Sequence, residues 1–284
     1  MDGRLCPKPT ARSLGGRVRT IAVINRKGGS GKTTTAVNTA AALAGLGHPA
    51  LLIDVDPQGS ASDWLDREGN DRGLREAFTV TGDLGRLAVP TDTVGLDIVP
   101  STQWLVTAEK NMLGDLSVGI SRALQRIPPR WDFVIVDCPP SLSYLAIGVM
   151  MGVRELVIPV EAHSMAFTGA VEVMDELPAV RKLNPSLSSI LLLPCRVTRT
   201  RHARGVIEAL EADFPAEVTT ARIRESITLA EAADERQPIS AYAPDGIGAA
   251  DYREFARELL NRAPPPVQAK GSWWQSPVST LSGR

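Results

Sequence analysis

Short apolar runs alternate with helical stretches along most of the chain. Five runs are typical of buried strands and lie at residues 20–24, 50–56, 133–136, 155–160 and 189–194. After the first run, residues 34–46 place Ala and Leu at helical spacing and end near Gly47. Strands that alternate with helices favour a parallel sheet that is covered on both faces. The pattern therefore predicts an α/β fold with a mostly parallel, twisted sheet and helices on both faces.

A glycine-rich loop joins the first predicted strand to the first predicted helix. Residues 25–35 read Asn-Arg-Lys-Gly-Gly-Ser-Gly-Lys-Thr-Thr-Thr. Glycines let the backbone approach a ligand, and the N–H groups at a helix start have no partner inside the helix, so together they form a cradle for a polyphosphate. Lys32 is expected to reach the outer phosphates, and the hydroxyl of Thr33 to bind Mg²⁺. The nucleotide-binding residues predicted in this loop are Lys27, Gly28, Gly29, Ser30, Gly31, Lys32, Thr33 and Thr34.

Three carboxylates end predicted strands, at the edge where parallel strands deliver side chains to a ligand. Asp54 and Asp56 are two residues apart, so on an extended strand both point to one face and can approach a magnesium-bound phosphate. Taken alone, two aspartates before a proline are as often turn formers. Asp137 ends another strand and is followed by Cys138, which is predicted to be a buried or loop-lining thiol, and by two prolines. Its carboxylate can hold the shell of a magnesium ion through water.

These motifs together resemble those of one known family. Residues 27–34, Lys-Gly-Gly-x-Gly-Lys-Thr-Thr, resemble the deviant Walker A loop of the ParA/MinD ATPases, although Arg26 stands where the standard loop has glycine. The segment Asp-Val-Asp-Pro-Gln-Gly that begins at Asp54 is similar to the family's switch I, and the strand ending at Asp137 looks like its Walker B strand and switch II. The resemblance is to a ParA-type P-loop NTPase and runs from about residue 19 to residue 262.

The resemblance implies ATP and Mg²⁺ as cofactors and slow hydrolysis of ATP. It implies that Lys27 crosses a dimer interface to the partner's nucleotide; the alternative is a solvated loop lysine. By the same resemblance Asp56 would position the attacking water, and Asp54 would bind on the nucleotide side by supporting the metal or Lys32. The catalytic residues expected are therefore Lys27, Lys32 and Asp56, and the metal-binding residues expected are Thr33, Asp56 and Asp137.

An arginine cluster follows the last predicted strand. In ParA proteins, basic residues in this region and near the C-terminal segment bind the DNA backbone without sequence preference, and Arg199 falls closest to such a position. A solvated face is the alternative, because Arg204 and Glu208 are four residues apart and can pair on a helix. The predicted DNA contacts are Arg196, Arg199, Arg201, Arg204, Arg222 and Arg224. The resemblance further implies a homodimer that forms with ATP and a ParB-like adaptor that accelerates hydrolysis.

Residues 223–232 resemble the segment of the family that lies on the adenine side of the nucleotide. Family members commonly carry Pro-Arg and a further Arg there, whereas this chain has Arg224, Glu225 and Thr228. The residues that contact the nucleobase are therefore left open.

Composition agrees with one compact cytoplasmic domain. The chain has 284 residues, of which 43% are hydrophobic, and a formal net charge of −1. No apolar run approaches the roughly 20 residues that span a bilayer, and the N-terminus lacks the apolar core of a signal peptide. We expect a flexible basic arm at 1–18, the ATPase domain at 19–262 and a disordered, Pro-rich tail at 263–284 that includes Trp273 and Trp274. Binding to DNA would place the protein on the nucleoid.

The expected function is an ATP-dependent dimerising switch that binds DNA nonspecifically and drives partition or positioning of DNA or another cargo. A MinD-like ATPase that positions membrane-bound or protein cargo without binding DNA is the first alternative, but no terminal basic amphipathic helix is evident. A metabolic enzyme on the same fold is the second, and the sequence offers no residues that can be assigned to its substrate pocket.

Overall fold

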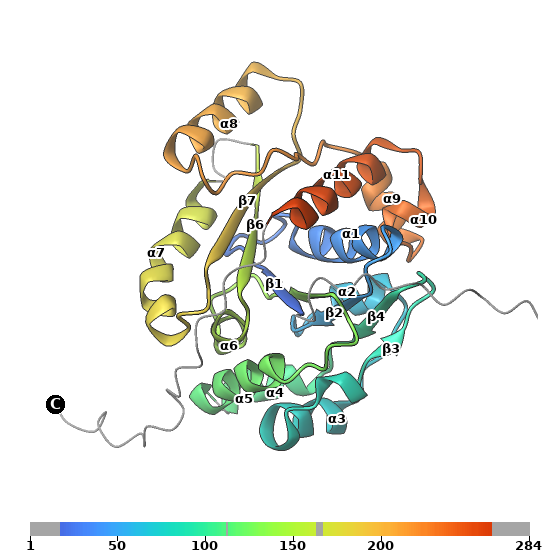
Figure 1. Ribbon diagram of the computed structural model, residues 1–284, viewed down its shortest axis with the longest axis vertical. Helices are drawn as coiled ribbons and strands as arrows, with labels where there is room; N and C mark the ends of the chain where they lie inside the picture. The colour runs from blue at the N-terminus through green and yellow to red at the C-terminus, as the bar shows by residue number, and fades with distance from the viewer. Residues whose placement is uncertain (1–17, 112, 163–166, 263–284) are drawn as a thin grey trace, which may run out of the picture.

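Seven strands form one sheet in the residues that the computed structural model describes, which are 18–111, 113–162 and 167–262 (Figure 1). Their order across the sheet is β3-β4-β2-β5-β1-β6-β7, and every neighbouring pair is parallel except β3 and β4. The strands are β1 (Arg19–Val23), β2 (Ala50–Asp54), β3 (Val89–Pro90), β4 (Leu96–Val99), β5 (Phe133–Asp137), β6 (Glu155–Glu161) and β7 (Ser189–Cys195). The mostly parallel sheet confirms the predicted fold class. The predicted tail and all but the last residue of the predicted arm lie outside the described residues.

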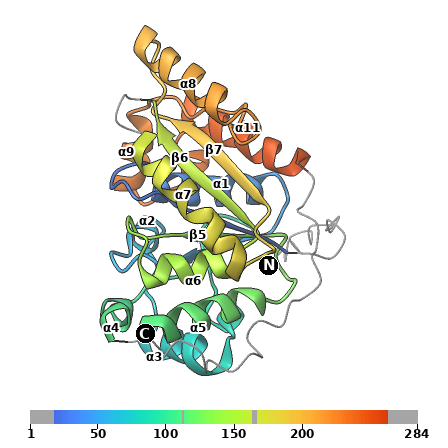
Figure 2. The same cartoon turned by 90° about the vertical axis from the view of Figure 1, so that its left-hand side faces the viewer.

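Helices cover both faces of the sheet (Figures 1 and 2). One face packs against α1, α2, α9, α10 and α11, and the other against α3, α4, α5, α6 and α7, while α8 lies at one end of the molecule. Their bounds are α1 (Lys32–Gly45), α2 (Ser60–Trp64), α3 (Asp71–Glu76), α4 (Trp104–Asn111), α5 (Leu113–Gln125), α6 (Tyr144–Gly152), α7 (Phe167–Leu183), α8 (Arg201–Asp213), α9 (Thr228–Asp234), α10 (Ile239–Tyr242) and α11 (Ile247–Asn261). None of these described helices is long and apolar enough to cross a membrane.

The central strands are buried on both faces. In β1, Ile21 and Val23 join the core beneath α1 and α11, whereas Ala22 joins the core beneath α5 and α6. In β5, Ile135 joins the core beneath α1 and α11, and Val134 joins the core beneath α5 and α6. Successive side chains of a strand point to opposite faces, so a strand that is covered on both sides reads as an unbroken apolar run. This is why the sequence pattern located these strands.

The carboxyl ends of β1, β2 and β5 meet at one edge of the sheet. The register pairs Val23 of β1 with Asp137 of β5, and pairs Asp137 with Asp54 of β2. The glycine loop leaves β1 at the same edge and leads directly into α1. The strand order therefore brings the loop and the two strand-end aspartates together, although more than a hundred residues separate the first from the last.

Both outer edges of the sheet end in short or partly covered strands. At one edge β3 has two residues, one of which is Pro90, and it pairs with β4 in antiparallel register. At the other edge β7 is flanked by isolated bridges from Leu192 to Val218 and from Val197 to Arg224. The sequence did not predict β3 or β4, because β4 is short and carries Asp97 in its middle.

Candidate functional site

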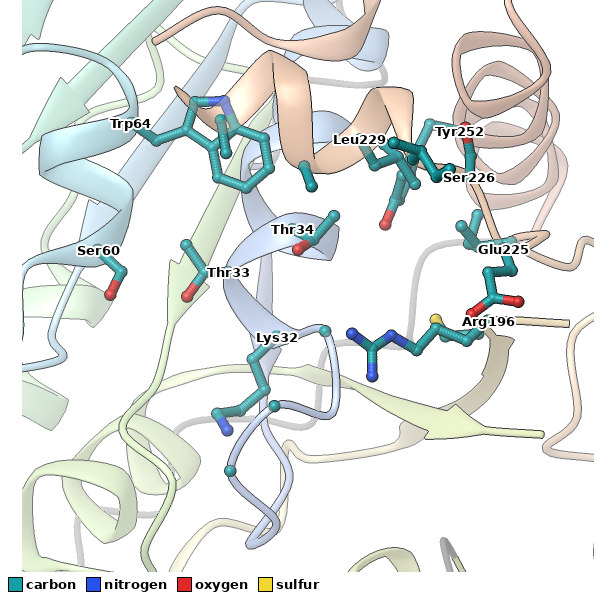
Figure 3. A pocket seen from close by; sticks show the side chains of 18 of the residues that line it. Lys32, Thr33, Thr34, Ser60, Trp64, Arg196, Glu225, Ser226, Leu229 and Tyr252 are labelled. Atoms are coloured by element: carbon teal, nitrogen blue, oxygen red, sulfur yellow. The ribbon is translucent and has the colours of Figure 1, made fainter. Parts of the chain in front are cut away.

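A pocket of about 990 Å³ opens at the carboxyl ends of the central strands (Figure 3). The glycine loop and Lys32 form one side, and Trp64, Leu229 and Tyr252 lie across the open space from Lys32. A volume of several hundred to a thousand cubic ångströms is typical of nucleotide and cofactor sites. The pocket thus has room for a nucleoside triphosphate with its phosphates on the loop.

The loop has the backbone shape that a phosphate cradle needs. Gly29 and Gly31 have φ angles of 75° and 86°, a region that other residues enter only with strain. α1 begins immediately after Gly31, and among the described residues no side chain caps this helix and no acidic residue lies in its first turn. The backbone N–H groups at the start of α1 are therefore available to an anion, whose negative charge the helix dipole favours.

Lys32 and Thr33 lie between this cradle and the strand-end carboxylates. The Lys32 side chain is buried, and its Nζ donates a hydrogen bond to the carbonyl oxygen of Lys27 at 3.1 Å. Burial lowers the pKa of Lys32, while the charges of Asp137 and Asp56 oppose that change. The hydroxyl of Thr33 donates to Asp137 Oδ2 at 2.7 Å. Two residues predicted to bind Mg²⁺ are thus already in contact.

The carboxylates create an excess of negative charge that fits a divalent cation. Burial raises the pKa of Asp54 to about 6, and burial together with the charge of Asp54 raises that of Asp137 well above its usual value. Asp137 Oδ1 is buried and has no hydrogen-bond partner among the described residues. Within the same residues no three His, Cys, Asp or Glu side chains form a complete metal cage. A Mg²⁺ ion beside Thr33 and Asp137 would satisfy the orphaned oxygen, and it would take its remaining ligands from phosphate and water.

Asp54 holds the loop that carries Asp56. Its Oδ2 accepts hydrogen bonds from the Ser62 backbone N–H at 2.9 Å and the Ser62 hydroxyl at 2.6 Å, and its Oδ1 accepts one from the Asp56 N–H at 3.1 Å. Ser101 extends this network, because its hydroxyl donates to the Asp56 carbonyl oxygen at 2.6 Å and its N–H donates to Ser62 Oγ at 2.8 Å. Within the described residues, the Asp54 side chain is therefore hydrogen-bonded to the loop residue Asp56 and to Ser62 of α2. The predicted contact of Asp54 with metal or Lys32 stays a prediction.

The front of the glycine loop is tied to β6 and α7. Lys27 Nζ donates to Glu161 Oε2 at 2.8 Å, and its backbone N–H donates to Asn25 Oδ1 at 2.9 Å. Arg26, the residue that departs from the standard loop, forms an ion pair with Glu172 of α7 at 3.1 Å. The departure therefore supplies an anchor from the loop to a helix.

The six arginines predicted to contact DNA divide into two groups. Arg196, Arg222 and Arg224 each form an ion pair with a carboxylate, and Arg196 and Arg224 also line the pocket. The other three are exposed at or just before the start of α8 and form no ion pair within the described residues: Arg199, Arg201 and Arg204. The alternative of a solvated face predicted an ion pair between Arg204 and Glu208. The described residues show no such pair.

The side of the pocket opposite the phosphate loop comes from the segment that the sequence left open. Ile223, Leu229 and Tyr252 line it together with Cys195 and Trp64. Trp64 is buried, lines the pocket and donates from Nε1 to the carbonyl oxygen of Gln237 at 2.8 Å. Only the tertiary fold brings α2 against this segment, so no local sequence signal marked Trp64 as part of the site.

Comparison with known proteins identifies the family. A family described as an AAA domain matches residues 18–189. The sporulation initiation inhibitor protein Soj of Bacillus subtilis is 35% identical, with 84% of this chain and 97% of Soj covered. The chromosome-partitioning ATPase Soj of Thermus thermophilus is 37% identical, with 88% and 98% covered. The chain belongs to the ParA-type partition ATPases.

The ParA-type assignment agrees with the fold and with the site. Cobyrinic acid a,c-diamide synthase from Mycobacterium smegmatis, solved with a bound ATP analogue and magnesium, has a TM-score of 0.73 and 28% identity, with 89% of this chain and all of that chain covered. As a ParA-type P-loop protein the chain is an ATPase, and ATP and Mg²⁺ are its cofactors. Its similarity to these relatives identifies it as a partition or positioning ATPase.

Proposed function

We propose that this ParA-type ATPase is a dimerising switch that binds duplex DNA nonspecifically with ATP and leaves it after hydrolysis. The single observation that carries the proposal is the phosphate loop, in which Lys32 and the Thr33–Asp137 contact lie behind an open cradle while Lys27 stands at its front. The remaining steps follow from where the other predicted residues lie.

Hydrolysis is assigned to three side chains around the loop. Asp56 lies beside the pocket on the loop held by Asp54 and orients the attacking water. Lys32 and Lys27 stabilise the negative charge that develops on the transferred phosphoryl group. When bound, Mg²⁺ would neutralise part of the negative charge of the phosphates. Thr33 and Asp137 are the residues that would hold it.

Dimerisation is assigned to Lys27. Its side chain is 41% exposed, so it stands at the surface of the loop rather than within the subunit. In the proposed dimer this lysine contacts the phosphates of the partner's nucleotide, and two subunits enclose two nucleotides. Assembly then depends on ATP, because the phosphate that Lys27 reaches exists only in the loaded partner.

DNA binding is assigned first to the arginines at the start of α8. Arg199, Arg201 and Arg204 are exposed and are free to meet backbone phosphates. A dimer presents two such sets, so the number of phosphate contacts, the affinity and the salt dependence all rise together. Arg196, Arg222 and Arg224 would first have to leave their carboxylate partners, and they contribute less in this proposal.

We place the protein in the cytoplasm on the nucleoid, with a ParB-like adaptor that accelerates hydrolysis. The cargo is chosen by that adaptor rather than by this chain. A MinD-like ATPase that positions membrane-bound or protein cargo without DNA is the alternative outcome of the test.

The test is retention of the chain on nonspecific duplex DNA with ATP–Mg²⁺, with ADP and without nucleotide, at rising salt. We expect retention with ATP alone and a steep loss with salt. The triple variant R199A/R201A/R204A should bind at least about tenfold more weakly with a shallower salt dependence, whereas the control R72A, on α3 at the opposite end of the molecule from α8 (Figure 1), should bind like the wild type. Equal retention in all three states would reject the nucleotide-dependent switch. Absent retention would reject DNA binding, and ATP-dependent sedimentation with lipid vesicles would then support the MinD-like alternative.

A further inference from the structure

Glu161, at the end of β6, joins the two cations that flank the phosphate loop. Its Oε2 accepts a hydrogen bond from Lys27 Nζ at 2.8 Å, and its Oε1 accepts one from Arg196 Nη1 at 2.8 Å. The Glu161 side chain is 7% exposed, while those of Lys27 and Arg196 are 41% and 60% exposed. A buried carboxylate therefore holds two partly exposed cations.

The two cations belong to different elements, and of the two Arg196 lines the pocket. Lys27 belongs to the glycine loop, and Arg196 follows β7 directly. Arg196 has a φ of 50°, an uncommon conformation for a residue with a side chain, and its guanidinium points across the pocket toward the loop (Figure 3). Glu161 thus determines where both cations lie before any phosphate enters.

The charges indicate that the arrangement changes when phosphate binds. Burial alone would raise the pKa of Glu161, but the hydrogen bond from Lys27 and the charges of Lys27 and Arg196 lower it, so the carboxylate is ionised at neutral pH. One negative charge is shared by two positive groups. A polyphosphate in the pocket offers Arg196 a larger negative charge than Glu161 does.

We propose that Glu161 is a positioning residue that retains Lys27 within its own subunit until the partner's nucleotide draws it away. The inference rests on the proposed function, in which Lys27 must reach the partner's nucleotide. If phosphate draws Arg196 away from Glu161 Oε1, the carboxylate is left to Lys27 alone and holds it more strongly, so the larger negative charge of the partner's nucleotide is what must displace Lys27. Glu161 therefore opposes assembly of the empty chain, and occupancy of both pockets is needed to overcome it.

The proposal is tested with Glu161→Gln, which keeps the size of the side chain and an acceptor oxygen but removes its charge. Dimerisation is followed by light scattering against ATP concentration, and steady-state ATP turnover is measured in parallel. A partly exposed ion pair changes an equilibrium by up to about fivefold. We expect the ATP concentration for half-maximal dimerisation, and KM with it, to fall about fivefold in E161Q while kcat stays within twofold of the wild type.

Glu172→Gln is the matched control. It removes the neighbouring ion pair to Arg26, which also joins the loop to the body of the protein but involves no predicted phosphate ligand. E172Q should leave both the dimerisation midpoint and KM unchanged. A residue with a merely structural role would instead lower the thermal unfolding midpoint of E161Q without moving the ATP midpoint.

Each result decides between the two proposals. A wild-type dimer with ATP, combined with an E161Q midpoint equal to the wild type, would overturn the role of Glu161 alone. A fall in kcat with an unchanged midpoint would also overturn it, because Glu161 would then align Lys27 for hydrolysis rather than retain it. A wild-type chain that stays monomeric with ATP would overturn the proposed switch, and the role of Glu161 with it.

Discussion

The catalytic edge of the sheet gathers like charges within a small buried volume. Asp54, Asp56 and Asp137 are all less than a tenth exposed, and Lys32 is the one buried ammonium beside them in the described part of the chain. Like charges that share a buried site disfavour their own ionisation. A divalent cation bound beside these carboxylates would therefore favour their ionised form, and Lys32 would remain available to a phosphate.

Replacing Asp56 by Ala should separate nucleotide binding from turnover. Asp56 is assigned to the attacking water and not to the cradle, so ATP affinity should change little while kcat falls about 100-fold or more. Binding of a fluorescent ATP analogue and phosphate release measure the two quantities. Asp63→Ala, which removes an exposed carboxylate from the nearby helix α2, should keep wild-type turnover. Undiminished turnover in D56A would reject the assigned role.

The raised pKa of Asp54 predicts a pH-dependent difference between the wild type and Asp54→Asn. The pKa is about 6 in the folded chain against an ordinary value of 3.8, so the folded chain favours the protonated carboxyl. Its contribution to the free energy of unfolding is fully present below pH 3.8 and is lost as the pH rises through about 6. The difference corresponds to about 3 kcal/mol. In magnesium-free buffer, the free energy of unfolding of D54N relative to the wild type should therefore rise by up to that amount between pH 4 and pH 7. Urea unfolding measures it, and a difference that stays constant with pH would contradict the prediction.

Single residues could be predicted from the sequence where their neighbours in the chain define them. Lys32 and Thr33 stand in a recognisable loop, and Asp137 ends an unbroken apolar strand. Ser62 and Glu161 had no such marker, because each acts through a partner that is distant in the chain or belongs to another element. Serine and glutamate are also common on any surface, so their type gave no indication.

At the scale of elements, close packing of α7 against the glycine loop fixes the position of Lys27. A methyl group added at Gly169 would lie 2.4 Å from Asn25 Oδ1 and 3.3 Å from the Lys27 N–H nitrogen. Asn25 in turn donates to the carbonyl oxygen of Pro159 at 2.7 Å, so it is not free to move away without losing that bond. The helix and the loop therefore behave as one unit.

Gly169→Ala should weaken ATP binding without unfolding the protein. Overpacking costs about 1–3 kcal/mol, which here displaces the loop and should lower ATP affinity about tenfold. The matched control is Gly205→Ala on α8, where an added methyl group meets nothing within 4 Å and should increase stability by up to about 1 kcal/mol. Calorimetric titration with ATP and thermal unfolding measure both variants. Wild-type ATP affinity in G169A would show that the loop adapts to α7.

Elements were predictable where hydrophobic periodicity was long and regular. β1, α1 and β6 begin and end within two residues of their predicted limits, because both faces of the strands and nearly every turn of α1 are buried. The short helices α2, α9 and α10 have too few residues for a period to emerge, and they are formed by packing against α1 and its neighbours. Of these, α2 and α9 also line the pocket opposite the phosphate loop.

At the scale of the whole molecule, one buried ion pair connects the beginning of the sheet to the last helix. Arg19 of β1 pairs with Glu155 of β6 at 2.6 Å and donates to the carbonyl oxygen of Leu259 near the end of α11. Its guanidinium also lies over the ring of Phe133, 5.2 Å from the centroid. Three segments that are far apart in the chain thus share one side chain.

Arg19→Met should destabilise the whole chain rather than the site. Removing one partner of a buried pair leaves an uncompensated charge and costs about 3–5 kcal/mol. We expect a lower urea midpoint, with KM for ATP unchanged under folding conditions. The double variant R19M/E155L should recover part of the loss, because no buried charge then remains alone. A loss below about 1 kcal/mol in R19M would mean that water reaches Glu155.

The edges of the sheet affect whether copies of this protein aggregate when they are close together. An exposed strand edge invites pairing with the edge of another molecule, which leads to aggregation. Here one edge ends in the two-residue β3 with Pro90, which has no N–H to donate, and the other is bridged at Leu192 and Val197. Within the part of the chain that the structure describes, neither edge offers a long row of unpaired backbone groups. Copies of this protein that gather at high local concentration can therefore associate reversibly through side chains. Each copy can then detach from the others without breaking a shared sheet.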